Sequence, residues 1–155
     1  MKSMYDLARD IKEAAEACER AKKDMPRRLG KKAVDVTKEN FVNQGFEGQR
    51  WKERAESTDK QYDRRGSYKG SVYSSKSPIL RQTNNLFNSI QFRVRGKMIE
   101  IGIFEDRIIK YAQRHNEGIG NSPKRQFIGY TLKMDIILRS RIEDSYKRIF
   151  KKFSK

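Results

Sequence analysis

The sequence predicts an α+β domain with N-terminal helices, a small antiparallel β-sheet and a long C-terminal helix packed on that sheet. Apolar residues recur every three or four positions near both ends of the chain, which is the period of an amphipathic helix. Between residues 90 and 104, apolar and polar residues alternate, which is the period of a strand. A chain of 155 residues is large enough for one core and small for two, so we expect a single domain over residues 1–155.

The N-terminal pattern predicts two helices, over residues 4–23 and 26–43. Pro26 has no amide donor, so it either kinks the first helix or lies in the first turn of the second. Helical spacing then continues to Gly45, which is the expected C-cap. The first helix has one apolar stripe, which we expect to be buried and which consists of Leu7, Ile11, Ala14, Cys18, Ala21 and Met25.

Residues 45–78 lack a helical or strand period and contain few aliphatic side chains. A connection of this length in a compact domain is usually functional or disordered, so we expect a flexible arm or an insertion. Its tyrosines are interleaved with arginines and lysines, a pattern that allows stacking on nucleobases. The alternative is a solvated loop, or one whose tyrosines pack on a neighbouring subunit. The candidate interface residues of this region are Trp51, Arg64, Arg65, Tyr68 and Tyr73.

The second half of the chain contains the sheet and two further helices. Asn84 or Asn85 is expected to cap a short helical turn before a hairpin over residues 90–104. Residues 106–117 are predicted to form a helix or tight turn that ends at Gly118, and residues 126–128 a short third strand. The C-terminal helix begins at Leu132, and its apolar stripe comprises Met134, Ile137, Leu138, Ile142, Ile149 and Phe153.

The composition limits the partners of the chain. It has 36 lysines and arginines against 20 acidic residues, a net charge of +16. Such an excess favours nucleic acid, an acidic protein surface or anionic lipid as a neighbour. Its single cysteine, Cys18, excludes an intramolecular disulfide. No stretch approaches the ~18 apolar residues of a membrane span, and the N-terminus is charged, so we expect a soluble, cytoplasmic protein at synthesis.

The sequence has no motif for catalysis or for binding a cofactor. His115 is the only histidine, and no spacing of cysteine and histidine residues would bring zinc ligands together. There is no nucleophile elbow and no phosphate-binding loop. The adjacent carboxylates at 105–106 and 143–144 point apart and are expected to be surface charge. We therefore predict no enzyme activity, no metal and no cofactor.

Several short motifs follow one another between residues 41 and 130. They are Phe41, Gly45-Phe46, Gly48 and Trp51, then Leu80-x-x-Thr83-Asn-Asn-Leu86-x-x-Ser89-Ile90, then Tyr111-Ala112, His115 and Gly118, and finally Pro123-x-Arg125-x-Phe127-Ile-Gly129. In this order they resemble the phage virion morphogenesis family, the tail-completion group of Mu-like and P2-like contractile-tailed phages. One departure is Asn84, where the family often has glycine; asparagine tolerates a left-handed backbone better than most residues.

The resemblance implies a structural role rather than a catalytic one. It implies a tail-completion or head–tail connector (neck) component that acts as a ring of identical subunits, expected to be a hexamer. The partners implied are other phage neck and tail proteins, with DNA contact possible in the channel and no membrane. The expected location is the virion neck or tail, and the host cytoplasm during assembly.

Most motif residues are predicted to be scaffold. Leu86 and Ile90 are expected to anchor the hairpin, and Gly118 to allow the turn out of its helix. Tyr111 and His115 lie four apart and share a helix face. The functional alternative for His115 is a ligand or a pH switch, and the structural one is a hydrogen-bonded packing residue. Pro123, Phe127 and Gly129 are expected to fix the start of the C-terminal helix, while Arg125 is predicted to face a partner.

Two other classes of protein are alternatives to the neck component. A basic nucleic-acid-binding protein would use the charge and the tyrosines directly, and composition alone would rank it first. It would bind short duplexes tightly with a steep salt dependence and would not assemble into rings. A nuclease would need clustered acidic metal ligands, which the sequence does not show.

Overall fold

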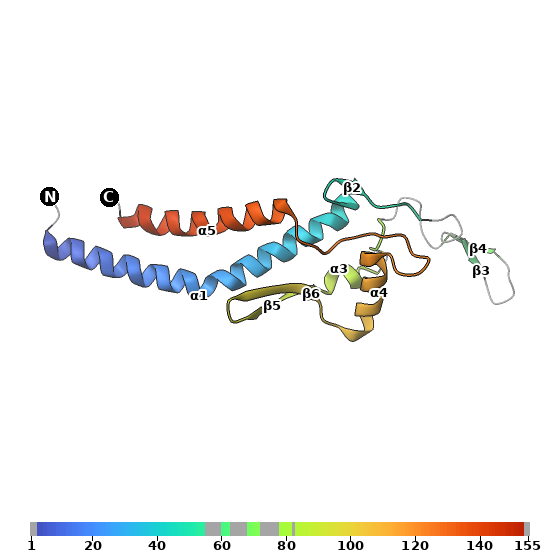
Figure 1. Cartoon of the computed structure of the whole chain (residues 1–155), viewed down its shortest axis with the longest axis horizontal. Helices are drawn as coiled ribbons and strands as arrows, with labels where there is room; N and C mark the ends of the chain where they lie inside the picture. Colours follow the sequence, from blue (N-terminus) through green and yellow to red (C-terminus); the bar gives the residue numbers. More distant parts are fainter. Residues whose placement is uncertain (1–2, 55–59, 63–67, 72–77, 82, 154–155) are drawn as a thin grey trace. The chain divides into compact units, whose positions relative to one another are not determined.

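The computed structural model describes residues 3–54, 60–62, 68–71, 78–81 and 83–153 (Figure 1). The long elements are the helices α1 (Met4–Asn43), α4 (Asp106–Glu117) and α5 (Leu132–Phe153) and the hairpin of β5 (Ile90–Arg95) and β6 (Met98–Ile103). Short elements are β1 (Gly45–Phe46), β2 (Gln49–Arg50), β3 (Lys60–Tyr62), β4 (Tyr68–Ser71) and α3 (Asn85–Asn88). The strands form three two-stranded sheets, β1–β2, β3–β4 and β5–β6, so the α+β fold class is confirmed.

The chain divides into two compact units, each built from segments that are far apart in sequence. Unit 1 contains residues 1–33, 92–100 and 130–155, and unit 2 contains residues 34–91 and 101–129. The helix α1 and the hairpin contribute to both units. The single domain over residues 1–155 stays a prediction. Within the described residues, no helix is both long enough and apolar enough to cross a membrane.

The N-terminal region is one helix that continues through Pro26, rather than two helices over residues 4–23 and 26–43. α1 contains Pro26 in its interior, where the ring removes one backbone hydrogen bond. Burial offsets this loss, because Met25 and, further along, Ala33 are buried. The helix ends at Asn43, and the left-handed residue after it is Gln44 (φ 51°) rather than the predicted cap Gly45.

The segment 45–78 contains more structure than its composition predicts. β1 and β2 pair antiparallel, with Gly45 opposite Arg50, and a side chain at Gly45 would collide with the Gln49 carbonyl. Trp51 follows this hairpin and is buried, so the segment contributes to the core after all. β3 and β4 also pair antiparallel, with a bulge between Gln61 and Tyr62.

In unit 1 both α5 and the hairpin tip pack against α1. Arg28 Nη1 of α1 donates a hydrogen bond of 3.4 Å to Ser145 Oγ of α5, and α5 runs beside the first part of α1 in Figure 1. The ring of Phe92 on β5 lies against Gly30 on α1. The sequence predicts that α5 packs on the sheet. Most of the hairpin and α5 belong to the same compact unit, and the described contacts join each of them to α1.

The packing at Gly30 leads to a prediction. A methyl group there would overlap the Phe92 ring, so Gly30→Ala should destabilise the protein by about 1–3 kcal/mol. An alanine in a helix without this contact would stabilise by about 0.5–1 kcal/mol, so the sign of the change is diagnostic. Urea unfolding measures it, and Gly30→Ala in a Phe92→Ala background should recover most of the loss. A stabilised Gly30→Ala single variant would show that Phe92 does not occupy this position.

The core of unit 2 is a cluster of aromatic rings around Phe41, near the end of α1. Phe41 is fully buried, and its ring centroid is 5.4 Å from Trp51, 5.7 Å from Phe87 and 5.0 Å from Phe127. The first two pairs are edge-to-face, the geometry that the aromatic quadrupole favours. Leu86 and Ile90 are buried in the same unit, which is the role predicted for them.

The predicted third strand at 126–128 does not form. Instead of a neighbouring strand, the side chain of Asn116 at the end of α4 satisfies this backbone: its Oδ1 accepts from the amides of Phe127 and Ile128, both at 3.0 Å. One side-chain amide therefore replaces the strand partner, so the segment is held in place without a sheet.

Candidate functional site

The segment 125–128 is held by hydrogen bonds from several parts of unit 2. Asn40 Nδ2 of α1 donates to the carbonyl of Phe127 at 3.0 Å, and Trp51 Nε1 donates to that of Gln126 at 2.7 Å. The amide of Arg125 donates to the carbonyl of His115 at 2.7 Å. With the Asn116 bonds, these contacts fix the backbone that leads towards α5, so Phe127 lies in the core with 1% of its surface exposed.

Two of the six predicted interface residues, Trp51 and Arg125, are buried, with 6% of the surface of each exposed. Arg125 Nε donates to the carbonyl of Lys52 at 2.9 Å, and its Nη2 donates to that of Glu53 at 3.0 Å. Arg125 therefore fixes the backbone after Trp51. Sequence spacing does not reveal this, because a charged residue is usually exposed unless it is paired.

The motif glycines have separate backbone roles. Gly118 ends α4 with a left-handed backbone (φ 75°), as predicted, and a side chain there would lie within 3.0 Å of Lys124. Gly129 allows the Phe46 ring to approach closely, at 2.8 Å from an added Cβ. Asn84, where the family often has glycine, has φ 56°. The left-handed turn predicted at this departure from the family pattern is thus confirmed.

The structure describes little about the other predicted interface residues. Arg64, Arg65 and Tyr73 lie outside the described residues, so their interface role stays a prediction. Tyr68 is the first residue of β4. The contacts that the structure describes for 45–78 include those of Trp51 and Arg54, the β1–β2 and β3–β4 pairings, and the carbonyls of Lys52 and Glu53 that accept from Arg125.

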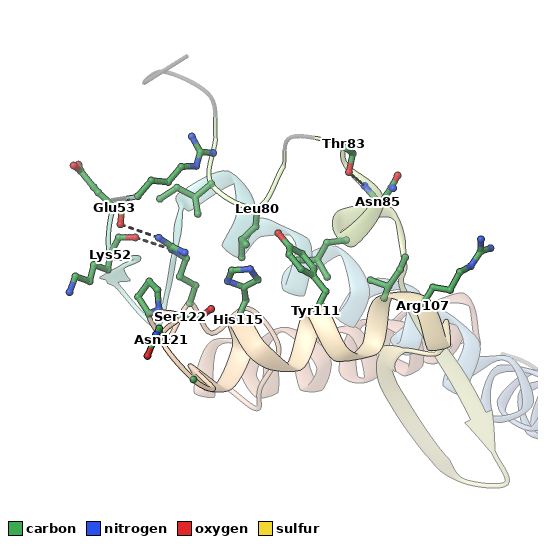
Figure 2. A pocket seen from close by; sticks show the side chains of 17 residues that line it. Lys52, Glu53, Leu80, Thr83, Asn85, Arg107, Tyr111, His115, Asn121 and Ser122 are labelled. Atoms are coloured by element: carbon green, nitrogen blue, oxygen red, sulfur yellow. Dashed lines mark hydrogen bonds between the residues drawn. The ribbon is translucent and has the colours of Figure 1, made fainter. Parts of the chain in front are cut away.

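Next to this framework, unit 2 contains a pocket of about 1170 Å³ (Figure 2). The segment after Trp51, the segment around Leu80, the α4 face and the loop 120–123 contribute its walls. Figure 2 shows Tyr111 and His115 projecting from the same side of α4, and their rings are edge-to-face at 4.6 Å. The shared helix face predicted for this pair is confirmed. Pro123 and Arg125 also line the pocket.

The charged groups of the pocket are mainly basic. Lys52, Arg54, Arg107 and Arg125 line it together with one acidic residue, Glu53. Burial lowers the pKa of the Arg125 guanidinium, and the like charge of Arg54 lowers it further. Arg54 Nη2 donates to the carbonyl of Pro78 at 2.9 Å. The pocket is thus a cationic concavity next to a buried arginine.

His115 is the titratable residue on the pocket wall. Its pKa is lowered from the usual 6.5, first by burial and then by the positive charges of Arg125 and Arg114. Its Nδ1 is buried and has no hydrogen-bond partner among the described residues. The sequence predicts a hydrogen-bonded packing histidine; the packing against Tyr111 is present, but the Nδ1 hydrogen bond is not.

The lowered pKa of His115 predicts a pH dependence of stability. In the unfolded chain the imidazole takes up a proton near pH 6.5, whereas the folded state resists protonation. Below pH 6.5 the unfolded state therefore binds more protons, and stability falls as the pH falls. Urea unfolding between pH 5 and 8 measures this, and His115→Gln should flatten the curve over that range. An identical pH profile in the variant would show that His115 is not the cause.

In the part of the chain that the structure describes, no three histidine, cysteine, aspartate or glutamate residues gather closely enough to hold a metal ion. Trp51, Asn116 and Arg125 each form hydrogen bonds with the main chain, and of these three Arg125 lines the pocket.

Comparisons with known proteins assign no class. No protein-family model, no curated protein and no solved structure matches the chain. What the structure establishes is an α+β protein with an aromatic core in unit 2, next to a cationic pocket. The sequence gives no signal for Asn40, Asn116 and Gly30, because isolated asparagines and a helix glycine have no pattern of their own.

Proposed function

We propose that this protein is a structural component of a phage virion, a tail-completion or neck protein that acts as a ring of identical subunits. One observation supports the proposal most: the separate motifs that resemble the virion morphogenesis family converge in unit 2. Phe41, Trp51, Leu86, Ile90 and Phe127 are all buried there. Motifs that are spread over about ninety residues of chain and meet in one core are expected of a shared fold.

The polar motif residues support a scaffold role in the same way. Arg125 holds the carbonyls of residues 52 and 53, and Asn84 and Gly118 supply left-handed turns. Residues that bind the main chain or form its turns stabilise the shape of the subunit, whereas catalytic groups must be directed at a substrate. A rigid subunit shape is the property that a ring component needs, since each subunit presents two different surfaces to its neighbours.

An exposed apolar stripe on α1 supports self-association. Met4, Leu7 and Ile11 follow one another by three and four residues, and all three side chains are exposed. The sequence predicts burial of the stripe to which Leu7 and Ile11 belong. The spacing is helical, but these two side chains are exposed. Exposed apolar surface of this kind is typical of contacts between chains. We therefore propose that neighbouring subunits contact this end of α1.

The remaining partners belong to the same proposal. Other neck and tail proteins would contact the ring, and the net charge of +16 would favour DNA in its channel or acidic neighbouring proteins. The protein would be located in the virion neck or tail, and in the host cytoplasm during assembly. A hexamer is the stoichiometry that the family resemblance implies.

Native mass spectrometry and negative-stain electron microscopy test the proposal. The purified protein, alone and mixed with phage tails or heads, is expected to form a closed ring or to join the particles. Leu7→Glu together with Ile11→Glu should reduce assembly, while Lys12→Glu, an exposed neighbour on α1, serves as the control. A monomer that never joins particles, yet binds short duplexes with nanomolar affinity and a steep salt slope, would instead identify a nucleic-acid-binding protein.

A further inference from the structure

Two energetically unfavourable features meet at the cationic pocket of unit 2. Leu80 has a left-handed backbone (φ 61°), a conformation that is rare and energetically unfavourable for a bulky residue. His115 Nδ1 is buried without a partner, and a group of this kind calls for an explanation such as a bound ligand. Both residues line the same pocket, and Figure 2 shows both side chains pointing into it.

The charges of the pocket indicate which ligand would use these features. Arg107 on α4 and Lys52 after β2 are exposed residues that line the pocket, and none of the ion pairs found among the described residues includes either of them. Arg54 and Arg125 add positive charge deeper in the wall, and Arg125 is buried. Glu53 is the single acidic residue of the lining. An anionic group is therefore the complement of this pocket.

The apolar part of the pocket lining favours a peptide over DNA as the ligand. Ile79, Leu80, Leu86 and Ile108 line the pocket beside the arginines. The phosphate backbone of a duplex is a convex, fully polar surface, which would leave such a concave apolar lining unfilled. A carboxylate on a short aliphatic stem satisfies both parts, since the stem contacts the apolar wall while the carboxylate meets the cations.

We propose that this pocket binds a glutamate or aspartate side chain from an acidic segment of a partner protein. Arg107 and Lys52 attract the segment, and Leu80 shifts to let the carboxylate reach His115. The inference rests on the pocket alone, so it stands or falls independently of the neck role. The occupant is a different protein, because this chain is itself strongly basic.

Binding of a carboxylate should also change the protonation of His115. In the unliganded protein, three features of its surroundings disfavour the imidazolium: burial, Arg125 and Arg114. Tyr111 is the titratable group stacked on the ring. A carboxylate placed beside the ring favours the charged form and supplies an acceptor for an N–H group. Binding would then take up a proton, and affinity would rise as the pH is lowered from 7.5 towards 5.5.

Isothermal titration calorimetry with a capped hexaglutamate peptide tests the proposal, with capped hexaglutamine as the matched probe without charge. We expect hexaglutamate to bind and hexaglutamine to bind at least about tenfold more weakly. Arg107→Gln should weaken hexaglutamate binding by about five- to tenfold. Lys110→Gln removes one positive charge from an exposed position of the same helix that does not line the pocket, and it should change affinity by less than about twofold.

The possible outcomes distinguish binding in the pocket from non-specific electrostatic attraction to the basic protein. Equal effects of Arg107→Gln and Lys110→Gln, or equal binding of the two peptides, would overturn the proposal. So would a short DNA duplex or inorganic phosphate that displaces hexaglutamate and shows the same dependence on Arg107. His115→Gln should abolish the rise in affinity at lower pH while leaving binding at pH 7.5 largely intact. A pH dependence that persists in this variant would exclude His115 from the site.

Discussion

Phe127→Ala is expected to lower the free energy of unfolding by about 3–5 kcal/mol. Phe127 has 1% of its surface exposed, and its ring centroid is 5.0 Å from that of Phe41. Removing the ring leaves a cavity in the aromatic cluster. Because Asn40 and Asn116 hold the backbone of residue 127, the surrounding structure cannot relax far enough to fill this cavity. Urea or thermal unfolding measures the change.

Phe150→Ala is the matched control for this prediction. It removes the same ring from α5, where 54% of the Phe150 surface is exposed, and it should change stability by less than about 1 kcal/mol. Equal losses in the two variants would mean that burial of Phe127 does not determine its contribution. An unchanged midpoint for Phe127→Ala would place this residue outside the core altogether.

Arg125→Ala is expected to have the next largest effect, a loss of about 2–4 kcal/mol. The substitution removes two hydrogen bonds from a charged donor, to the carbonyls of Lys52 and Glu53. It leaves these acceptors without their partner and opens space beside Trp51. The loss should therefore appear in folding, measured by unfolding, as well as in assembly.

Arg107→Ala controls for the charge in this experiment, because Arg107 lines the same pocket but is exposed. It should leave stability within about 0.5 kcal/mol of the wild type. If Arg125→Ala folds as stably as the wild type and only assembly suffers, Arg125 is a partner contact, as its sequence motif first suggests, and the two carbonyl contacts carry little free energy.

Periodic features of the sequence predict the regular elements well. The hairpin and the C-terminal helix follow directly from alternation and from helical spacing, since these patterns reflect burial of one face. The left-handed turns at Asn84 and Gly118 are also predicted, because few residue types accept that conformation. The scaffold role of Leu86, Ile90 and Phe127 follows from their apolar character and their positions in the motifs.

Other features depend on tertiary contacts that have no local signature. Pro26 normally ends a helix, yet burial on either side keeps α1 continuous. The apolar stripe of Leu7 and Ile11 has the correct period, but period alone does not say whether this subunit or another covers it. Residues 126–128 have a strand-like composition, and only the position of Asn116 shows that a side chain takes the place of a partner strand.

The division of the chain into two units predicts the order in which its parts fold during synthesis. All of unit 2 lies within residues 34–129, whereas unit 1 needs residues 1–33, the hairpin tip and the last helix. Every segment of the aromatic core is therefore synthesised, and leaves the ribosome, before α5. We expect unit 2 to acquire its hydrogen bonds first, and the first turns of α1 to pack only once α5 has also emerged.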